Sequence, residues 1–310
     1  MQTILGSSGI IGRLATREVR KYTGVIKLAS RNPQKVHDTD HTVKADLMDR
    51  SKVFEVVRGA EMTFLTAGLE YKAEVWEKQW PVIIQNAIDA CRHYKSRLIF
   101  FDNVYAYGKV NGWMTEETPY NPCSRKGRVR MEIAEHLMKE HGKGNFEVMI
   151  VRSADFYGPH TKNSFLNAMV LSKFAKRKRA QWMLDDQKVH SFTYTPDAAK
   201  AMVFLGNEPD TFGQIWHLPT DFRPFTGQQL IEMAARSFGV NPRYSVYSRN
   251  FLKMIGWFNE IVKENEEMLY QNEFDYKFSS EKFRTAYPDF STTSYEEGLR
   301  LTAESYRGSL

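Results

Sequence analysis

Residues 1–12 read MQTILGSSGIIG, and this stretch determines the fold that we expect. The first five residues are a short apolar run, and a helical pattern follows residue 12. A strand, a glycine-rich turn and a helix in this order are typical of a site for a dinucleotide pyrophosphate. Gly6 allows a tight turn, Gly9 lets the backbone approach the phosphates, and Gly12 lets helix and strand pack closely. The alternative is an ordinary strand–helix turn without a ligand.

The composition is ordinary for a globular protein: 42% of the 310 residues are hydrophobic and 26% are charged. This length suits one large α/β unit with a smaller lobe attached. No stretch approaches the roughly 20 apolar residues that span a bilayer, and the N-terminal apolar run is too short for a signal peptide. Cys91 and Cys123 fit neither a disulfide framework nor a zinc site, so we expect a reducing cytoplasm and no metal.

The net charge is +6, and its one dense basic run is Lys173–Arg179. Cations suit the C-terminal end of a helix, so the run is interpreted as a solvated helix end. The alternative is a site for an anionic substrate or for the cofactor phosphate. No nucleic-acid motif accompanies the run, so we expect neither nucleic acid nor membrane as a partner.

Apolar runs alternate with helical patterns along the first half of the chain. This alternation predicts an α/β fold, a Rossmann-type doubly wound parallel sheet with a smaller C-terminal substrate lobe. The predicted strands are Met1–Leu5, Val25–Ala29, Thr42–Ala45, Met62–Thr66, Leu98–Phe101, Val148–Val151 and Gln214–Leu218. The predicted helices include Trp76–Arg92, Met131–Lys139, Asn163–Lys178, Pro196–Leu205 and Thr226–Phe238, the last capped by Thr226 and ended by Gly239.

We expect residues 1–158 to form the dinucleotide-binding core. Residues 159–310 would form mainly the substrate-binding lobe, interleaved with returning core elements. Ligands of such sheets lie beyond the carboxyl ends of the strands. The segment Asn250–Leu269 is rich in Met and aromatic residues. It is expected to pack in the core or between lobes, and a lid or a dimer face is the alternative.

Several motifs together resemble the short-chain dehydrogenase/reductase superfamily, in its extended or atypical NAD-dependent epimerase/dehydratase type. The resemblance covers nearly the whole chain and is far more specific than the glycines alone. The motifs are Gly6-Ser7-Ser8-Gly9-Ile10-Ile11-Gly12, Ala45-Asp46-Leu47, Ala106-Tyr107-Gly108, Arg152–Pro159, Thr195–Ala199, Tyr287–Phe290 and Thr293–Leu299.

The resemblance implies a role for each matching position. The whole glycine turn, including Ser7, Ser8, Ile10 and Ile11, would contact the cofactor. Asp46, followed by Leu47, would bind the adenine amino group, and Ala67 and Gly68 would line the adenosine–ribose path. The remaining cofactor residues would be Asp102, at the end of the fifth strand, and Arg152 and Ala154, along the nicotinamide. The substrate residues expected in the second lobe are Asp155, Tyr157, His160 and His190.

The residues after the second strand bear on the choice between NAD and NADP. NAD binders usually carry Asp or Glu about 20 residues beyond the glycine turn, where it accepts from the ribose hydroxyls. This chain has Ala29-Ser30-Arg31-Asn32 instead, without a carboxylate. The planar cation of Arg31 suits a 2′-phosphate. We therefore predict that NADP is preferred over NAD; the alternative is a solvent-facing arginine.

The family resemblance also implies a Tyr-x-x-x-Lys pair on the helix after the fifth strand, and this pair is missing. Lys126 stands where the tyrosine is expected and Arg130 where the lysine is. Arg130 can hold ribose hydroxyls but cannot donate a proton near neutral pH. Asn103 stands where the family has a serine or threonine, and Tyr105 is an alternative proton donor. The two cations could also only grip the cofactor or an anionic substrate.

These features predict an NADP(H)-dependent oxidoreductase or epimerase-like enzyme that acts on a small organic substrate. Anionic compounds are among the candidate substrates. Lys126 or a bound water would move the proton, while Arg130 and Asn103 orient ribose and substrate. Loss of the tyrosine supports a second hypothesis, a non-catalytic NADP-binding redox sensor. The resemblance also implies a homodimer through the helices Trp76–Arg92 and Met131–Lys139.

Overall fold

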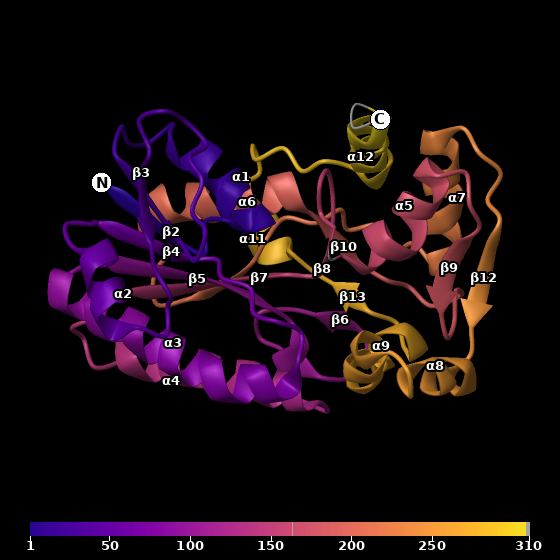
Figure 1. Ribbon diagram of the computed structural model, residues 1–310, viewed down its shortest axis with the longest axis horizontal. Coiled ribbons are helices and arrows are strands. Elements are labelled where there is room, and N and C mark those ends of the chain that lie inside the picture. Colours follow the sequence, from indigo (N-terminus) through magenta and orange to yellow (C-terminus); the bar gives the residue numbers. More distant parts are fainter. Residues whose placement is uncertain (163, 308–310) are drawn as a thin grey trace. The chain divides into compact units, whose positions relative to one another are not determined.

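Within residues 1–162 and 164–307, which the computed structural model describes, seven parallel strands form one sheet in the order β11-β7-β5-β4-β1-β2-β3 (Figure 1). They are β1 (Gln2–Leu5), β2 (Ile26–Ser30), β3 (His41–Lys44), β4 (Met62–Leu65), β5 (Arg97–Asn103), β7 (Val148–Ser153) and β11 (Ile215–His217). Each corresponds to a strand predicted from the sequence, and the α/β class is confirmed. The strand order reverses at β1 and β4, where open α/β sheets bind their ligands.

Two compact units make up the chain, each built from three segments. The first contains the sheet and comprises Met1–Ala106, Arg125–Arg152 and Ala198–Leu218. The second comprises Tyr107–Ser124, Ser153–Asp197 and Pro219–Leu310. The chain therefore leaves the first unit three times and returns to it twice, so that β7 and β11 are supplied by separate segments.

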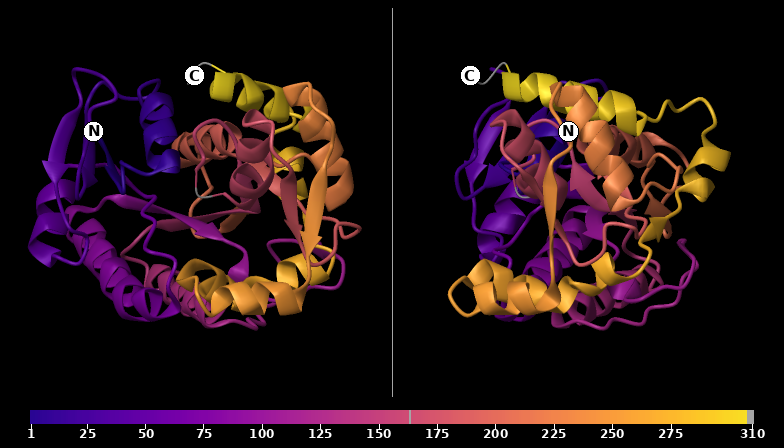
Figure 2. Two further views of the ribbon diagram at one scale, coloured as in Figure 1. Left: turned by 45° about the vertical axis from the view of Figure 1, so that its right-hand side comes forward. Right: turned by 90° about the vertical axis from the view of Figure 1, so that its right-hand side faces the viewer.

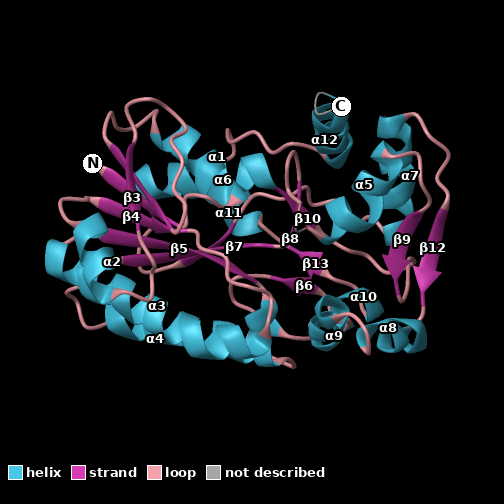
Figure 3. Ribbon diagram, in the orientation of Figure 1, coloured by secondary structure: helices cyan, strands magenta, loops and turns pink. Residues whose placement is uncertain are grey.

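Helices cover both faces of the sheet in the first unit. Figure 3 shows α1 (Ile10–Val19) and α6 (Thr195–Asn207) on one face, and α2 (Arg50–Val57), α3 (Ala73–Tyr94) and α4 (Arg125–His141) on the other. Helix α1 buries Ile11, Ala15 and Val19, which recur every four residues along one face. No helix in the described part of the chain is long and apolar enough to cross a bilayer.

Helix α4 begins at Arg125, six residues before the predicted start at Met131. The first turns contain Lys126 and Arg130, and these charged residues do not form the apolar pattern by which a helix is predicted. Both side chains are nevertheless buried, with 0% and 5% of their surfaces exposed. Aromatic rings from other elements cover them, so tertiary contacts extend the helix where the local sequence does not predict it.

An ion-pair cluster links α3 to α4. The carboxylate of Glu140 accepts from Lys143 Nζ at 2.6 Å and from Arg92 Nη2 at 2.5 Å. These two hydrogen bonds, that of Lys143 foremost, lower the pKa of Glu140 to about 2. The link fixes the C-terminal half of the helix that carries Lys126 and Arg130.

Replacing Glu140 with glutamine is expected to destabilise the protein near neutral pH, and this difference should vanish in acid. The folded pKa of about 2 lies below the ordinary glutamate value of about 4.3, so the contribution is present above about pH 4.3 and is lost as the pH falls toward 2. Urea unfolding of wild type and Glu140→Gln across this range measures it. Glu135→Gln, at an exposed position of α4, is the control. A pH-independent difference would contradict the assignment.

Short strand pairs and helices form the second unit. The parallel pairs are β6 (Trp113–Met114) with β13 (Lys277–Phe278), β8 (Asp155–Tyr157) with β10 (Phe192–Tyr194), and β9 (Ala180–Met183) with β12 (Tyr244–Tyr247). Figure 2 shows β9 and β12 side by side. The sequence did not predict these strands, because two to four residues are too few to display a period.

The helical elements of the second unit are mostly short. They are the 3₁₀ turn η1 (Tyr105–Tyr107), which begins in the first unit, the π-helical turn η2 (Asn167–Leu171), α5 (Ser172–Ala175), α7 (Gly227–Phe238), α8 (Arg249–Gly256), α9 (Glu260–Asn265), the 3₁₀ turn η3 (Glu266–Met268), α10 (Tyr270–Glu273), α11 (Glu281–Ala286) and α12 (Tyr295–Arg307). The predicted cap of α7 is confirmed: Thr226 forms a capping box with Gln229, and Gly239 adopts φ +64° at the other end.

The prediction of a helix over Asn163–Lys178 is confirmed for residues 165–175, which are helical without a break, with the π-helical turn η2 inside the helix and α5 as its last turn. Asn163 lies outside the described residues. The amide of Asn167 bonds both the N–H and the carbonyl of Gly158, at 3.2 and 2.9 Å, which ties this turn to the end of β8. At the other end, Arg177 has φ +53°, which stops the helix.

The expected packing of Asn250–Leu269 is only partly found. Leu252 and Met268 are buried, but Trp257, Phe258 and Ile261 are 80%, 89% and 72% exposed. Helix α8 ends at Gly256 and the chain turns before α9, so the aromatic pair lies on the turn between them. Composition alone predicted burial because it does not show where this turn falls.

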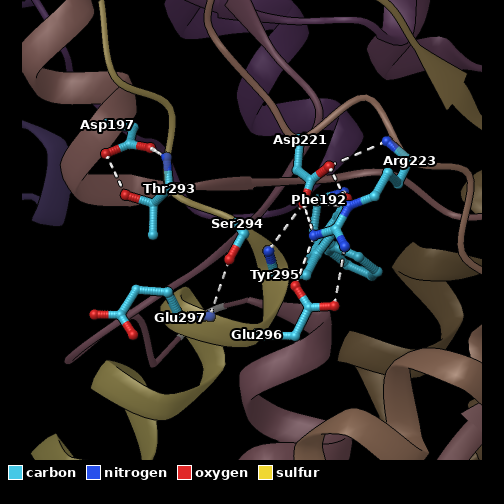
Figure 4. A network of polar contacts seen from close by, with 9 residues as sticks. All are labelled: Phe192, Asp197, Asp221, Arg223, Thr293, Ser294, Tyr295, Glu296 and Glu297. Atoms are coloured by element: carbon cyan, nitrogen blue, oxygen red, sulfur yellow. Dashed lines mark hydrogen bonds and ion pairs between the residues drawn. The ribbon is translucent and has the colours of Figure 1, made fainter.

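A polar network holds the N-terminal end of α12 (Figure 4). The carboxylate of Asp221 accepts from the Tyr295 N–H at 3.0 Å and from Arg223, and Arg223 also donates to Glu296 at 2.6 Å. The Tyr295 hydroxyl accepts from the Phe192 N–H at 2.7 Å. Residues far apart in the sequence are joined here within the second unit.

Candidate functional site

Two glycines of the turn after β1 are required by backbone packing. Gly6 has φ +89°, and a Cβ there would lie 2.5 Å from the Ala67 backbone. A Cβ on Gly12 would lie 2.6 Å from the Gly6 carbonyl oxygen and 2.8 Å from Ser7 Cα. At Gly9, the nearest atom to such a Cβ would be 3.4 Å away, which is an ordinary contact. Backbone packing therefore explains why glycine stands at positions 6 and 12. It does not explain the glycine at position 9, so another requirement must account for Gly9.

The turn presents hydrogen-bond donors of the kind that bind phosphate. Gly9 caps α1 without a side-chain hydrogen bond, and the first turn of the helix holds no acidic residue. The hydroxyl of Ser7 is buried and has no hydrogen-bond partner among the described residues. Ser8 instead lies 2.6 Å from the Ser30 hydroxyl and donates to the Asn32 carbonyl, which ties this turn to the end of β2. A helix N-terminus beside an unsatisfied hydroxyl fits an anionic group.

The other predicted adenosine residues follow neighbouring strands of the same sheet. Arg31 follows β2 and is exposed, and Asp46 and Leu47 follow β3. Asp46 is exposed and accepts from the Met48 N–H at 3.0 Å, while Leu47 is buried. Ala67 and Gly68 follow β4, and Ala67 directly faces Gly6. The carboxyl ends of β1, β2, β3 and β4 thus carry these residues along one edge.

A buried ion-pair cluster lies at the ends of β5 and β7. Asp102 is 2% exposed, and its two carboxylate oxygens face Arg130 Nε at 3.5 Å and Arg152 Nε at 3.1 Å. The Arg130 guanidinium also lies over Trp80 and Trp76, 4.2 and 4.5 Å from their ring centroids. Burial lowers the pKa of Arg130, and the Asp102 charge opposes that effect. Asp102 and Arg152 thus stand next to the last residues of β5 and β7, and Arg130 of α4 contacts Asp102.

A second cluster lies around Lys126, which is 0% exposed. Its ammonium is 4.7 Å from the centroid of the Tyr71 ring. The Tyr71 hydroxyl donates to the Tyr105 hydroxyl at 3.2 Å, and the Tyr105 ring stacks on Trp76 at 6.2 Å and 14°. Asn103 Oδ1 accepts from the Tyr105 N–H at 3.0 Å. The predicted residues Lys126, Tyr105 and Asn103 are therefore brought together.

Sequence reasoning missed Tyr71. It stands in the loop after β4, three residues beyond Gly68, and no helical or strand period includes it. Its only sequence signal is its place after the carboxyl end of a strand. The loop is held by Trp76, whose indole N–H donates to the Glu70 carbonyl at 3.0 Å.

The predicted substrate residues belong to the second unit and have different environments. Asp155 and His190 meet, with Oδ2 and Nε2 3.0 Å apart, and the imidazole is 3% exposed between Phe192 and Tyr276. His160 is exposed and has φ +58°.

Tyr157, the fourth predicted substrate residue, and Ala154, which is predicted to lie along the nicotinamide, are both buried. Ala154 donates its N–H to Thr193 at 3.0 Å. Tyr157 was predicted at the substrate mouth, but it is a core residue, 1% exposed and stacked on Tyr295, and burial raises its pKa well above the usual value. The pairing of β8 with β10 places Tyr157 in this core.

Comparison with known proteins adds a family and a fold. A family model described as "NAD dependent epimerase/dehydratase family" matches residues 3–218. The Arabidopsis thaliana 3beta-hydroxysteroid-dehydrogenase/decarboxylase isoform 2 is 26% identical over 173 residues, 52% of this chain and 30% of the plant protein. Protein YeeZ of Escherichia coli K12 is 35% identical over 77 residues, 24% of this chain and 27% of that protein. The matched segments thus span about a third or less of these relatives.

Solved structures are similar over the full length. MoeE5, in complex with UDP-glucuronic acid and NAD, has a TM-score of 0.81 at 17% identity and covers 100% of this chain and 99% of its own. The UDP-glucose 4-epimerase of Thermus thermophilus, in complex with NAD, has a TM-score of 0.80 at 16% identity, with 100% of both chains covered. At this identity the likeness shows a shared fold.

Proposed function

We propose that this chain, which belongs to the NAD dependent epimerase/dehydratase family, is an enzyme that exchanges hydride between a nicotinamide dinucleotide and a small organic substrate. The observation that carries the proposal is the turn after β1. Its backbone is too close-packed for side chains at Gly6 and Gly12, and the buried Ser7 hydroxyl lies beside the N-terminal end of α1. Backbone amides and this hydroxyl together suit a pyrophosphate.

The residues along the strand ends would each hold one part of the cofactor, which supplies a hydride acceptor or donor when bound. The Gly6–Gly12 turn would bind the pyrophosphate, and Asp46, Leu47, Ala67 and Gly68 would line the adenosine. Asp102 and Arg152 are buried, so they would support the nicotinamide end from beneath rather than touch it. Ala154 follows β7 and would border the same end. Asn103 orients the backbone of Tyr105.

The preference for NADP over NAD is part of the proposal and rests on Arg31. This side chain is exposed directly after β2. The buried carboxylate closest after it in sequence, Asp40, is neutralised by Arg20 and accepts the N–H groups of Val36 and His37 at 2.9 and 2.8 Å. The Asp40 carboxylate is therefore held by interactions within the fold. The exposed Arg31 guanidinium can approach a 2′-phosphate.

Replacing Arg31 with alanine is expected to weaken NADPH binding by about 10- to 100-fold, the value of a hydrogen bond to a charged group. NADH binding should change little, because NADH lacks the phosphate. Calorimetric titration with both coenzymes measures this. Arg17→Ala removes the same charge at an exposed position in the last turn of α1 and serves as the control. Equal losses for both coenzymes, or tighter NADH binding by wild type, would contradict the preference.

A turnover screen tests the enzymatic function itself. The solved relatives are named with UDP-glucuronic acid or UDP-glucose, and a curated relative is named a 3beta-hydroxysteroid dehydrogenase. UDP-glucuronic acid, UDP-glucose and a 3beta-hydroxysteroid, each offered with both coenzymes, make the first panel. Chromatography of the products is needed beside coenzyme absorbance, because an epimerase restores its coenzyme. Tight NADPH binding without turnover of any carbonyl or alcohol would instead support the redox-sensor hypothesis.

A further inference from the structure

The two cations that replace the Tyr-x-x-x-Lys pair are poorly placed to touch a substrate. Lys126 is 0% exposed, and Arg130 is 5% exposed and covered by Trp76 and Trp80. Tyr71 and Tyr105, in contrast, are only partly buried. A proton that leaves or enters this part of the first unit therefore passes more readily through a phenol than through the ammonium of Lys126.

The two phenols form a hydrogen-bonded pair. Tyr71 comes from the loop after β4 and Tyr105 from η1 after β5, and the Tyr71 hydroxyl donates to the Tyr105 hydroxyl at 3.2 Å. Trp76 holds both residues, since its ring stacks on Tyr105 and meets the edge of Tyr71 at 5.7 Å and 84°. Because the Tyr71 hydroxyl is the donor, its hydrogen bond would stabilise a negative charge that develops on the Tyr105 oxygen.

The charged groups around this pair favour a phenolate. Lys126 lies over the Tyr71 ring, and Arg130 interacts electrostatically with both Tyr105 and Tyr71. Arg152 and Asp102 complete the cluster, which holds three cations and one carboxylate. On the Tyr71 loop, Glu70 and Lys72 pair with each other at 3.0 Å. A nearby positive charge stabilises the ionised form of a tyrosine.

We infer that Tyr105 is the proton-transferring residue of the proposed reaction, that Tyr71 stabilises its phenolate by hydrogen bonding, and that Lys126 is a positioning residue. In carbonyl reduction, a bound reduced nicotinamide would supply the hydride to the substrate carbon and would itself be oxidised. The carbonyl oxygen takes the proton from Tyr105, so that the phenol O–H bond breaks and the alcohol O–H bond forms. Solvent then returns a proton to Tyr105. This inference rests on the proposed function.

Titration of the protein without cofactor or substrate tests the pair directly. Tyrosinate absorbance is followed against pH in wild type, Tyr105→Phe, Tyr71→Phe and Lys126→Met, with Tyr22→Phe as the surface control (Tyr22 is 46% exposed). We expect one early-ionising tyrosine in wild type and Tyr22→Phe, its loss in Tyr105→Phe, and its shift to higher pH in Tyr71→Phe and Lys126→Met. An early ionisation that persists in Tyr105→Phe, or its absence from wild type, would overturn the inference.

Turnover of a substrate found in the screen supplies the second readout. Tyr105→Phe should lower kcat by about 100-fold or more, the usual share of general acid–base catalysis, while KM and NADPH affinity stay within about twofold. Tyr71→Phe should lower kcat less and shift the pH profile. Unchanged kcat in Tyr105→Phe would overturn the inference and leave the proposed function standing. If wild type turns over no substrate, the proposed function fails, and the titration still decides the phenol pair.

Discussion

Replacing Asp102 with alanine is expected to destabilise the protein by about 3–5 kcal/mol, the cost of leaving buried charge without its partner. Asp102 is 2% exposed and lies between Arg130 Nε at 3.5 Å and Arg152 Nε at 3.1 Å. Its removal would leave two buried guanidinium groups without the Asp102 carboxylate. Denaturant unfolding, with the midpoint and slope compared with wild type, measures the loss.

A surface ion pair provides the matched control for Asp102. Asp89 pairs with Arg50 at 3.2 Å, and their side chains are 26% and 62% exposed. Asp89→Ala should cost no more than about 1 kcal/mol, because solvent screens that pair. If Asp102→Ala yields no folded protein, the triple variant Asp102→Leu, Arg130→Met and Arg152→Met remains informative, since an apolar replacement of a buried triad often restores stability. Similar losses for Asp102→Ala and Asp89→Ala would contradict the role of the buried cluster.

The opening turn and the parallel sheet could be predicted because their signals are local. Gly6, Gly9 and Gly12 follow an apolar run and precede a helical pattern, and further strands such as β5 and β7 are apolar runs that end in polar residues. Backbone geometry explains two of these glycines. Gly6 adopts a positive φ, and at Gly12 there is room for a hydrogen atom but not for a Cβ. The edge that carries the predicted adenosine residues follows from the parallel strand order alone.

The surroundings of the cations could not be predicted in this way. The burial of Arg130 depends on Trp76 and Trp80, and the burial of Lys126 depends on Tyr71. These three aromatic residues lie about 50 residues earlier in the chain than the cations that they cover. A sequence of alternating cations resembles an exposed helix start until these rings are placed. Tyr71 was missed for the same reason, because its partner Tyr105 follows a different strand.

The exposed pair Trp257–Phe258 illustrates the opposite error. Apolar composition predicted packing for Asn250–Leu269, but burial depends on where a helix ends. Helix α8 ends at Gly256, so its buried face stops with Leu252 and Gly256. The two aromatic side chains that follow lie on the turn and are exposed.

Alanine substitutions at Gly12 and Gly9 are expected to separate what the fold requires from what the cofactor requires. A Cβ on Gly12 would meet backbone atoms at 2.6 and 2.8 Å, and neither atom can turn aside as a flexible side chain would. Gly12→Ala should therefore destabilise the protein by about 1–3 kcal/mol, even though alanine favours the helix. Thermal unfolding measures the effect, and Gly24→Ala is the control because its Cβ would meet no atom within 4 Å.

Gly9→Ala should give the reverse pattern. Its Cβ would make only a 3.4 Å contact with the Gly6 carbonyl oxygen, so the cost to stability should be about 1 kcal/mol or less, as for other N-cap replacements. The added methyl group would stand where a pyrophosphate must approach the backbone amides at the start of α1, so NADPH affinity should fall by about tenfold or more in calorimetry. Wild-type affinity in Gly9→Ala would mean that the dinucleotide does not lie on this turn, and the proposed function would lose the observation that carries it.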